Sequence, residues 1–116
     1  MTPDGIMEGM RQKNLDLQNK NVQIVSLATT QANAQRDYRI AIAAKIAKLR
    51  LDGESVSLAD TLAKGDEDVA NKKVDFVIAE ATYKACLESI KDTRAALDTF
   101  RSLLTWQREE KYSKQI

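Results

Sequence analysis

The apolar residues of this chain recur at steps of three and four along two long stretches that no glycine or proline interrupts. The chain has 116 residues, and residues 10–52 and 66–116 contain neither glycine nor proline. Ala, Leu, Lys, Glu, Gln and Arg, which are strong helix formers, fill these stretches. The pattern predicts two long helices at 6–51 and 66–113, joined by a connector at 52–65.

The matched lengths of these two helices, and the short connector between them, indicate an antiparallel helical hairpin. In such a hairpin each helix covers the apolar stripe of the other. At this chain length we expect one domain rather than two. The predicted fold class is therefore all-α, a coiled-coil hairpin with a short helical connector, forming a single domain over residues 1–116.

The second predicted helix carries apolar residues on two faces. A seam with alternating four- and three-residue steps is typical of a coiled coil; it consists of Ala79, Tyr83, Cys86, Ile90, Thr93, Leu97, Phe100 and Leu104. Roughly opposite this seam lie Val74, Val77, Ile78, Ala81 and Ala85. One partner helix cannot cover both faces, so the connector or a second subunit must supply more cover. We therefore expect copies of the hairpin to associate into a homo-oligomeric helical bundle.

The first predicted helix divides into two unlike halves. Residues 38–51 are strongly apolar, whereas residues 12–35 carry nine Asn and Gln side chains. Three- and four-residue steps predict a seam of Met7, Met10, Asn14, Leu17, Asn21, Ile24 and Ala28. Buried Asn14 and Asn21 would restrict register and oligomeric state at a cost in stability. The alternative is a weakly packed, partly frayed arm, because Asn is a poor helix former.

Helix-end signals gather in the connector. Gly53 and Gly65 each follow a predicted helix, at the position where a left-handed residue usually ends one. Ser57, with Asp60 three residues later, predicts the N-cap and capping box of a short helix at 58–64. These signals divide the connector into a turn, one short helix and a second turn.

The acidic triplet Asp66, Glu67 and Asp68 begins the second long helix. Asp66 is the predicted N-cap, and the other two lie in the first turn, where the helix dipole favours negative charge. The alternative is a weak divalent-cation site that recruits carboxylates from the connector, although the spacing matches no EF-hand loop. We expect the capping role and no metal site.

Charge and reactive residues restrict the function. Lys and Arg number 18 against 17 Asp and Glu, so the whole chain has no bias toward nucleic acid or anionic membranes. There is no histidine and one cysteine, Cys86, which excludes internal disulfides, histidine acid–base chemistry and ordinary zinc sites. No apolar run approaches the length of a membrane span. We expect a soluble, intracellular protein without catalytic residues or cofactors, whose Cys86 is packed and inert.

Exposed aromatic and basic residues are the candidate binding sites. Trp106 lies off the seam and could anchor a partner, with Tyr112 nearby. Alternatively, it caps the open end of the hairpin or packs in an oligomer. The amide-rich arm with Asn14 and Asn21 is the other expected protein-binding surface. The arginines Arg94, Arg101 and Arg108 recur every seven residues and could follow a phosphate backbone. Interspersed acidic residues favour the alternative that these charges pair across helices.

Three stretches carry a resemblance to known proteins: LAKGDEDVA at 62–70, YKACLESI at 83–90 and FRSLLTWQR at 100–108. Around them, residues 36 to 110 resemble a group of uncharacterised small helical proteins encoded by phages and prophages of Gram-positive bacteria. Genes of that group tend to lie among early phage genes for DNA replication and recombination. The resemblance implies a viral origin and the cytoplasm of a bacterial host, and it carries over no functional residues.

Together these features predict a non-enzymatic coiled-coil protein that binds itself and an unidentified protein. Its expected role is accessory or inhibitory, in phage DNA metabolism or host takeover. Two alternatives stay open: a nucleic-acid-binding accessory protein that uses the three arginines, and a structural virion or assembly component. Shape alone does not choose among them.

Overall fold

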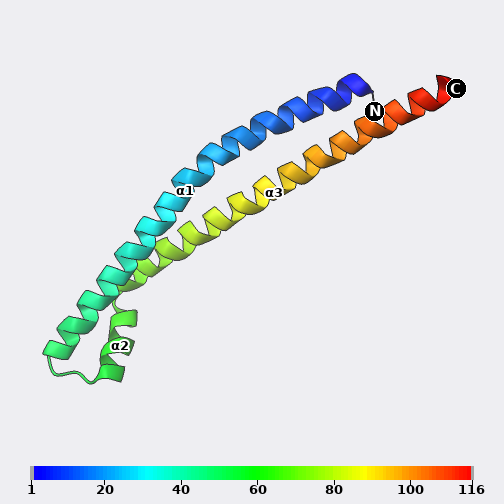
Figure 1. Ribbon diagram of the computed structural model, residues 1–116. Coiled ribbons are helices and arrows are strands. Elements are labelled where there is room, and N and C mark those ends of the chain that lie inside the picture. Colours follow the sequence, from blue (N-terminus) through cyan, green and yellow to red (C-terminus); the bar gives the residue numbers. More distant parts are fainter. Residues whose placement is uncertain (1, 116) are drawn as a thin grey trace. The chain divides into compact units, whose positions relative to one another are not determined.

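The computed structural model describes residues 2–115, and this range is almost entirely helical. Its three helices are α1 (Pro3–Leu51), α2 (Val56–Gly65) and α3 (Glu67–Gln115), and no strand occurs within the same range. The all-α fold with two long helices and a short helical connector is confirmed (Figure 1). Both long helices pass through two compact units. Unit 1 contains the chain up to Ile24 and again from Ala85, and unit 2 is Val25–Lys84.

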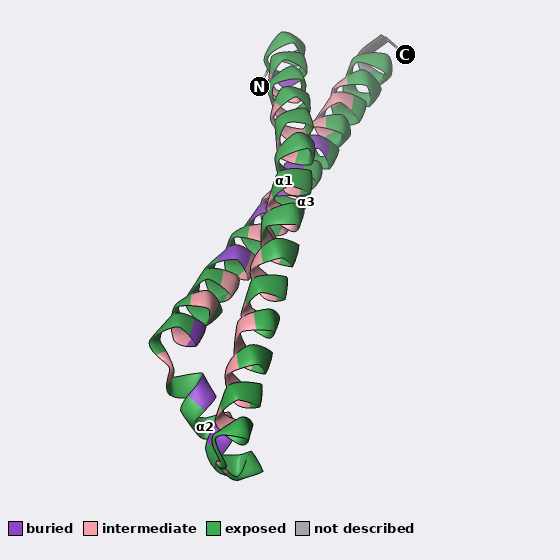
Figure 2. Ribbon diagram, turned by 90° about the vertical axis from the view of Figure 1, so that its left-hand side faces the viewer, coloured by how far each residue is buried: buried purple, intermediate pink, exposed green. Residues whose placement is uncertain are grey.

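Within unit 1, α1 and α3 lie side by side and run in opposite directions. Gly9 of α1 approaches Phe100, whereas Lys20, eleven residues later in α1, bonds to Thr93. The partner's number falls as the α1 number rises, which defines an antiparallel pair. Among the residues of this unit whose exposure is described, the buried ones are Ile6, Cys86, Ile90, Thr93 and Leu97, and Figure 2 marks buried positions in purple.

Within unit 2, α1 and α3 are also antiparallel and meet through aromatic and charged side chains. The rings of Tyr38 and Phe76 stack with centroids 6.3 Å apart, and the Lys73 ammonium lies 4.9 Å from the Tyr38 ring centroid. Closer to the connector, Lys45 Nζ lies 3.4 Å from Asp66 Oδ1. A cation over an aromatic ring is attracted to the face of the ring, so Lys73 adds to the packing of this pair.

The connector helix α2 lies alongside the end of α1 in Figures 1 and 2. Its Ala59 and Ala63, four residues apart and so on one face, have no exposed surface. With Val69 and Ala79 of α3 they are the buried residues of unit 2. Small side chains let α2 approach closely, while its Leu58 and Leu62 stay 45% and 43% exposed.

The end of α1 is closed by Gly53, as its position in the sequence predicts. Gly53 has φ 96°, a left-handed conformation that favours glycine. Its N–H donates to the Arg50 carbonyl at 3.1 Å, and the Glu54 N–H donates to the Leu49 carbonyl at 3.1 Å. This pair of bonds forms a Schellman motif, which satisfies carbonyls that the helix end leaves open.

Two predictions about the ends of α2 are wrong. The N-cap is Ser55, whose Oγ accepts a hydrogen bond from the Leu58 N–H at 3.3 Å. Ser57 lies inside the helix, because the chain leaves the Gly53 turn extended at Ser55 and can begin the helix at the next residue. Gly65 is the last helical residue of α2 without a positive φ, and the break falls on extended Asp66.

The predicted seam of α3 is confirmed. All eight of its members, from Ala79 to Leu104, are buried or half-buried. The apolar residues on the opposite side, Val74, Val77, Ile78, Ala81 and Ala85, are all exposed, so α2 does not cover them.

The predicted seam of α1 is wrong at three positions. Met7, Asn14 and Asn21 are exposed, and their neighbours toward the N-terminus, Ile6, Lys13 and Lys20, occupy the inward positions. Met10, Leu17, Ile24 and Ala28 are half-buried as expected. Lysine can take such positions because its methylene stem packs while its ammonium reaches a polar partner. The amide-rich residues 12–35 are helical throughout, as part of α1.

A glycine notch in unit 1 sets how closely α1 approaches α3. A Cβ added to Gly9 would lie 2.6 Å from Cζ and 2.8 Å from Cε1 of Phe100, closer than real Cβ contacts. The ring of Phe100 therefore rests on bare backbone. Only glycine leaves enough space for the ring at this position, so a larger residue in place of Gly9 would push Phe100 away from α1.

We expect Gly9→Ala to lower the free energy of unfolding by up to about 2 kcal/mol. Overpacking costs about 1 to 3 kcal/mol, which equals or exceeds the gain of about 1 kcal/mol from replacing a helical glycine with alanine. Gly65→Ala, where a Cβ meets open space, is the control and should raise stability. Urea unfolding measures both changes. In a Phe100→Leu background, Gly9→Ala should cost less, and an unchanged cost would contradict the notch.

Candidate functional site

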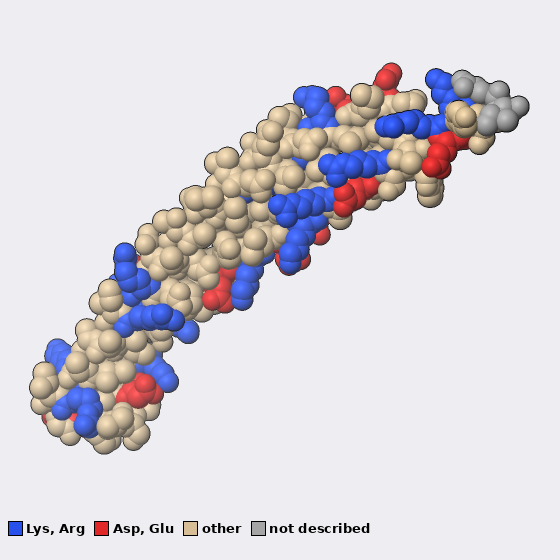
Figure 3. Space-filling model, viewed as in Figure 1, with Lys and Arg blue, Asp and Glu red and all other residues tan. Residues whose placement is uncertain are grey.

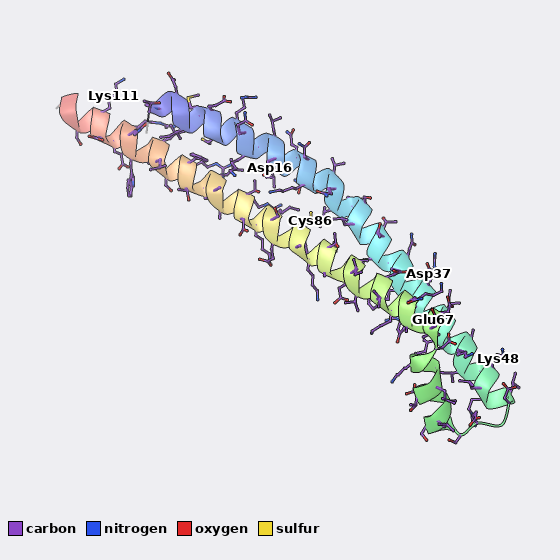
Figure 4. All side chains as sticks on the ribbon, turned by 180° about the vertical axis from the view of Figure 1, so that it is seen from behind. Asp16, Asp37, Lys48, Glu67, Cys86 and Lys111 are labelled. Atoms are coloured by element: carbon purple, nitrogen blue, oxygen red, sulfur yellow. The ribbon has the colours of Figure 1, made fainter. Side chains whose placement is uncertain are left out.

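A polar layer crosses the seam of unit 1. Lys20 Nζ lies 2.9 Å from Thr93 Oγ1 and 2.9 Å from Asp16 Oδ2. The Thr93 side chain is buried, its residue only 3% exposed, and its hydroxyl donates to the Ser89 carbonyl at 2.9 Å. Figure 4 labels Asp16 on the side of α1 that faces α3. Three polar side chains from two helices thus satisfy one another where the neighbouring seam positions are apolar.

The electrostatics of this layer follow from its geometry. The hydrogen bond from Lys20, with smaller contributions from the charges of Lys20 and Lys13 and from Thr93, holds the pKa of Asp16 below its usual range. The Lys20 bond to Thr93 joins the two helices, whereas the Thr93 bond to Ser89 lies within α3, so only the Lys20 bond depends on how α1 is placed against α3. The layer therefore favours one register of α1 against α3, the role that the sequence assigned to Asn14 and Asn21.

Asn14 and Asn21 themselves lie outside the seam, on the exposed side of α1. Asn14 lines a shallow, mainly apolar groove of unit 1, whose other walls come from Met7, Met10, Arg11, Leu15, Gln18 and Leu104. Met7 is 60% exposed and Leu15 45%. The amide is thus available to a partner, but not as a buried determinant of oligomeric state.

The three arginines of the predicted basic stripe are all exposed on α3 of unit 1. Arg101 Nη1 pairs with Asp98 Oδ1 at 2.9 Å, and Lys91 nearby pairs with Glu88 at 3.2 Å. Figure 3 shows Lys and Arg along α3 with Asp and Glu among them. Unit 1 as a whole has nine basic and eight acidic residues. Arg101 is thus paired, but within α3, so the predicted pairing across helices is wrong for this arginine.

Trp106 and Tyr112 are the exposed aromatic residues of α3. They are 69% and 67% exposed. The alternative that Trp106 caps the end of the hairpin is therefore wrong. Tyr112 lies beside Arg108 and Lys111 on a shallow surface of α3. Both aromatic residues present their side chains to solvent, as a protein-binding role requires.

The acidic triplet caps α3, as predicted. Asp66 Oδ2 accepts a hydrogen bond from the Val69 N–H at 3.2 Å. This bond, together with Lys45, holds the pKa of Asp66 below its usual range. Asp68 Oδ1 lies 3.7 Å from Lys72 Nζ in the same helix. Glu67, which Figure 4 labels, is exposed. Among residues whose placement is described, no three Cys, Asp or Glu side chains converge as a metal site would need.

The single thiol is packed in the seam. Cys86 is 9% exposed, and its Sγ lies 3.9 Å from the Lys20 carbonyl oxygen, to which it donates a weak hydrogen bond. Burial against backbone removes it from reagents in solution. The prediction of a packed cysteine is confirmed.

Unit 2 exposes the largest set of neighbouring apolar side chains on α3. Val74 and Val77 are each 53% exposed and Ile78 is 59% exposed, with exposed Ala81 beside them. We call these four residues the outer stripe. A second exposed set surrounds α2, and sequence reasoning missed it: Leu51, Val56, Leu58 and Leu62. The sequence signal for this second set was the number of apolar residues in the connector, which is more than one short helix can bury on one face.

Comparison with protein-family models, curated proteins and solved structures finds no match for the chain. In the described range, none of the helices combines the length and the apolar character that crossing a bilayer requires.

The polar layer predicts a pH dependence of stability. Asp16 is more acidic in the folded state, so it contributes stability above the pKa of an unfolded Asp, about 3.9. This contribution is lost as the pH falls through the lower folded pKa. Thermal unfolding of the wild type and of Asp16→Asn between pH 7 and 3 measures it.

We expect the stability difference between these two proteins to shrink as the pH falls below 4. Asp92→Asn, which removes an exposed carboxylate from α3, is the control and should keep the wild-type profile. A constant difference between wild type and Asp16→Asn across the range would contradict the charged role of Asp16.

Proposed function

We propose that this protein is a non-enzymatic, homo-oligomeric coiled-coil protein that acts by binding other proteins. The observation that carries the proposal is the exposure of the outer stripe on a helix whose other side is already buried. Clustered apolar surface of this kind marks association sites in proteins that work in water. The absence of histidine from the sequence and the burial of Cys86 support a role without catalysis.

The partner and setting follow from the exposed aromatics and from the resemblance of residues 36 to 110. Aromatic side chains contribute strongly to binding when a partner covers them, and Trp106 and Tyr112 are available. The resemblance supports a phage origin, a place in the cytoplasm of a bacterial host and an accessory or inhibitory role. That role concerns phage DNA metabolism or takeover of the host.

Light scattering coupled to gel filtration tests the oligomeric part. We expect a mass above that of one 13.0 kDa chain at micromolar concentration, because solvent-exposed aliphatic side chains gain free energy on burial. Dilution should return the mass toward the monomer. A stable monomer over the whole concentration range would contradict the proposal.

A second candidate function, binding of nucleic acid, rests on the spacing of three exposed arginines. Arg94, Arg101 and Arg108 lie on one flank of α3 at seven-residue intervals. A phosphate backbone bound there would release counterions, so binding would weaken steeply with salt. The balanced charge of unit 1 favours the protein-binding role over this one.

A gel-shift titration at low salt, with single- and double-stranded DNA, separates the two functions. The protein-binding role predicts no shift that depends on the arginines. A variant with Gln at all three positions is compared with one carrying Gln at Lys48, Arg50 and Lys64, three exposed bases of unit 2. A shift that only the arginine variant abolishes would establish the second function.

A further inference from the structure

The outer stripe runs straight along one side of α3 in unit 2. Val74 and Ala81 are seven residues apart and therefore fall on one line, with Val77 and Ile78 on either side of it. Glu67, seven residues before Val74, lies on the same line and is exposed. The segment of α3 from Glu67 to Lys84, which contains the stripe and the charged residues at its two ends, is about 26 Å long at 1.5 Å per residue.

The two ends of the stripe carry opposite charges. Glu67 and Asp68 precede the apolar residues, and Lys84 follows them with its side chain 68% exposed. Lys84 Nζ lies 3.0 Å from Glu80 Oε1 in the same helix, a surface pair that contributes little and leaves the lysine free to exchange partners. Within unit 2 the stripe thus has acids beyond its N-terminal end and Lys84 on the flank of its C-terminal end, and Glu88, seven residues after Ala81, continues the same line into unit 1.

This charge order distinguishes between two ways of pairing the stripe with itself. A parallel pair would place the acids of one copy against the acids of the other, and the lysines against each other. An antiparallel pair places Lys84 of each copy near Glu67 of the other. The acidic residues of the two copies then lie at opposite ends of the interface, and so do the lysines. Opposite charges across an interface fix orientation more than they add affinity.

We infer that a second copy of this chain docks on the outer stripe with its α3 antiparallel to the first. The inference rests on the proposed homo-oligomer and assigns its contact. A two-fold axis crosses the stripe, so that Val74 of each copy packs against Ile78 of the other. Asn71 and Ala81 of opposite copies then come together, and Lys84 meets Glu67 at both ends.

Cross-linking of single cysteines tests the orientation. In a Cys86→Ala background, Asn71→Cys and Ala81→Cys each add one exposed thiol, and a short bis-maleimide joins thiols that come close. The antiparallel pair places residue 71 of one copy near residue 81 of the other, and about 15 Å from its own equivalent. We expect covalent dimers in the mixture of the two variants and none in either variant alone. Cross-linking of each variant with itself would overturn the inference.

Substitution of the apolar centre tests the surface in the protein with its native cysteine. Ile78→Lys adds a charge to the stripe, and Val22→Lys adds the same charge on α1, where Val22 is 76% exposed. Both changes keep the monomer's buried residues intact. We expect light scattering to find Ile78→Lys monomeric and Val22→Lys oligomeric.

These results separate the inference from the proposed function. An oligomer that survives Ile78→Lys would overturn the docking surface and leave the homo-oligomer standing. A monomeric wild type would remove both.

Exchange of the two end charges supplies an independent check. Glu67→Lys or Lys84→Glu alone should weaken association several-fold, and the double variant should recover most of the loss. Lys91→Glu is the control, because Lys91 is also 68% exposed and has a local carboxylate partner, but it lies seven residues beyond Lys84, in unit 1 and past the end of the stripe. Additive losses in the double variant would overturn the antiparallel arrangement.

Discussion

The pairing of α1 with α3 along a single seam is the constraint on which the other features of the chain depend. A helix packed against one partner buries one face, so most of each 49-residue helix stays in contact with water. Among the residues whose exposure is described, eight apolar side chains and Thr93 are buried. With so small a core, stability depends on a few close contacts, and apolar residues off the seam stay exposed for a partner.

Two contacts in unit 1 make that seam specific. The Phe100 ring requires the bare backbone of Gly9, and the buried Thr93 hydroxyl accepts a hydrogen bond from Lys20 across the seam. Sliding α1 by one turn so that Lys13 faced Phe100 would bring a side chain against the ring and Ile24, an apolar residue, opposite Thr93. A polar layer within an apolar seam often has this role, setting register at some cost in stability.

How far the sequence predicts this fold differs between the two long helices. The α3 seam is regular and apolar, so its spacing alone identifies the buried residues. The α1 seam contains Lys13 and Lys20, and a pattern based on side-chain polarity places these outside and shifts the seam to Asn14 and Asn21. Thr93 was the missed signal, because a hydroxyl inside a seam can accept a hydrogen bond from the facing helix while it donates to its own, and a lysine at the facing position can supply that bond. Ser55 and Ser57 are equally good caps, and only the exit of the chain from the Gly53 turn decides between them.

The sequence also predicts some features of the candidate sites and misses others. Charge patterns at a helix start are local, so the sequence correctly identifies Asp66 as a cap, and spacing correctly places the three arginines on one flank. Whether those arginines keep free charge depends on neighbours such as Asp98, which only the structure shows. The exposed residues around α2 escaped prediction because their accessibility depends on how α2 rests on α1.

We propose that association covers the outer stripe of unit 2. Methyl NMR on dilution tests it most directly, because methyl shifts report the surroundings of each side chain. The account predicts that the signals of Val74, Val77 and Ile78 move as the protein is diluted through its dissociation range, while that of Val22 stays fixed. Fixed signals from all three stripe residues, with or without movement elsewhere, would contradict it.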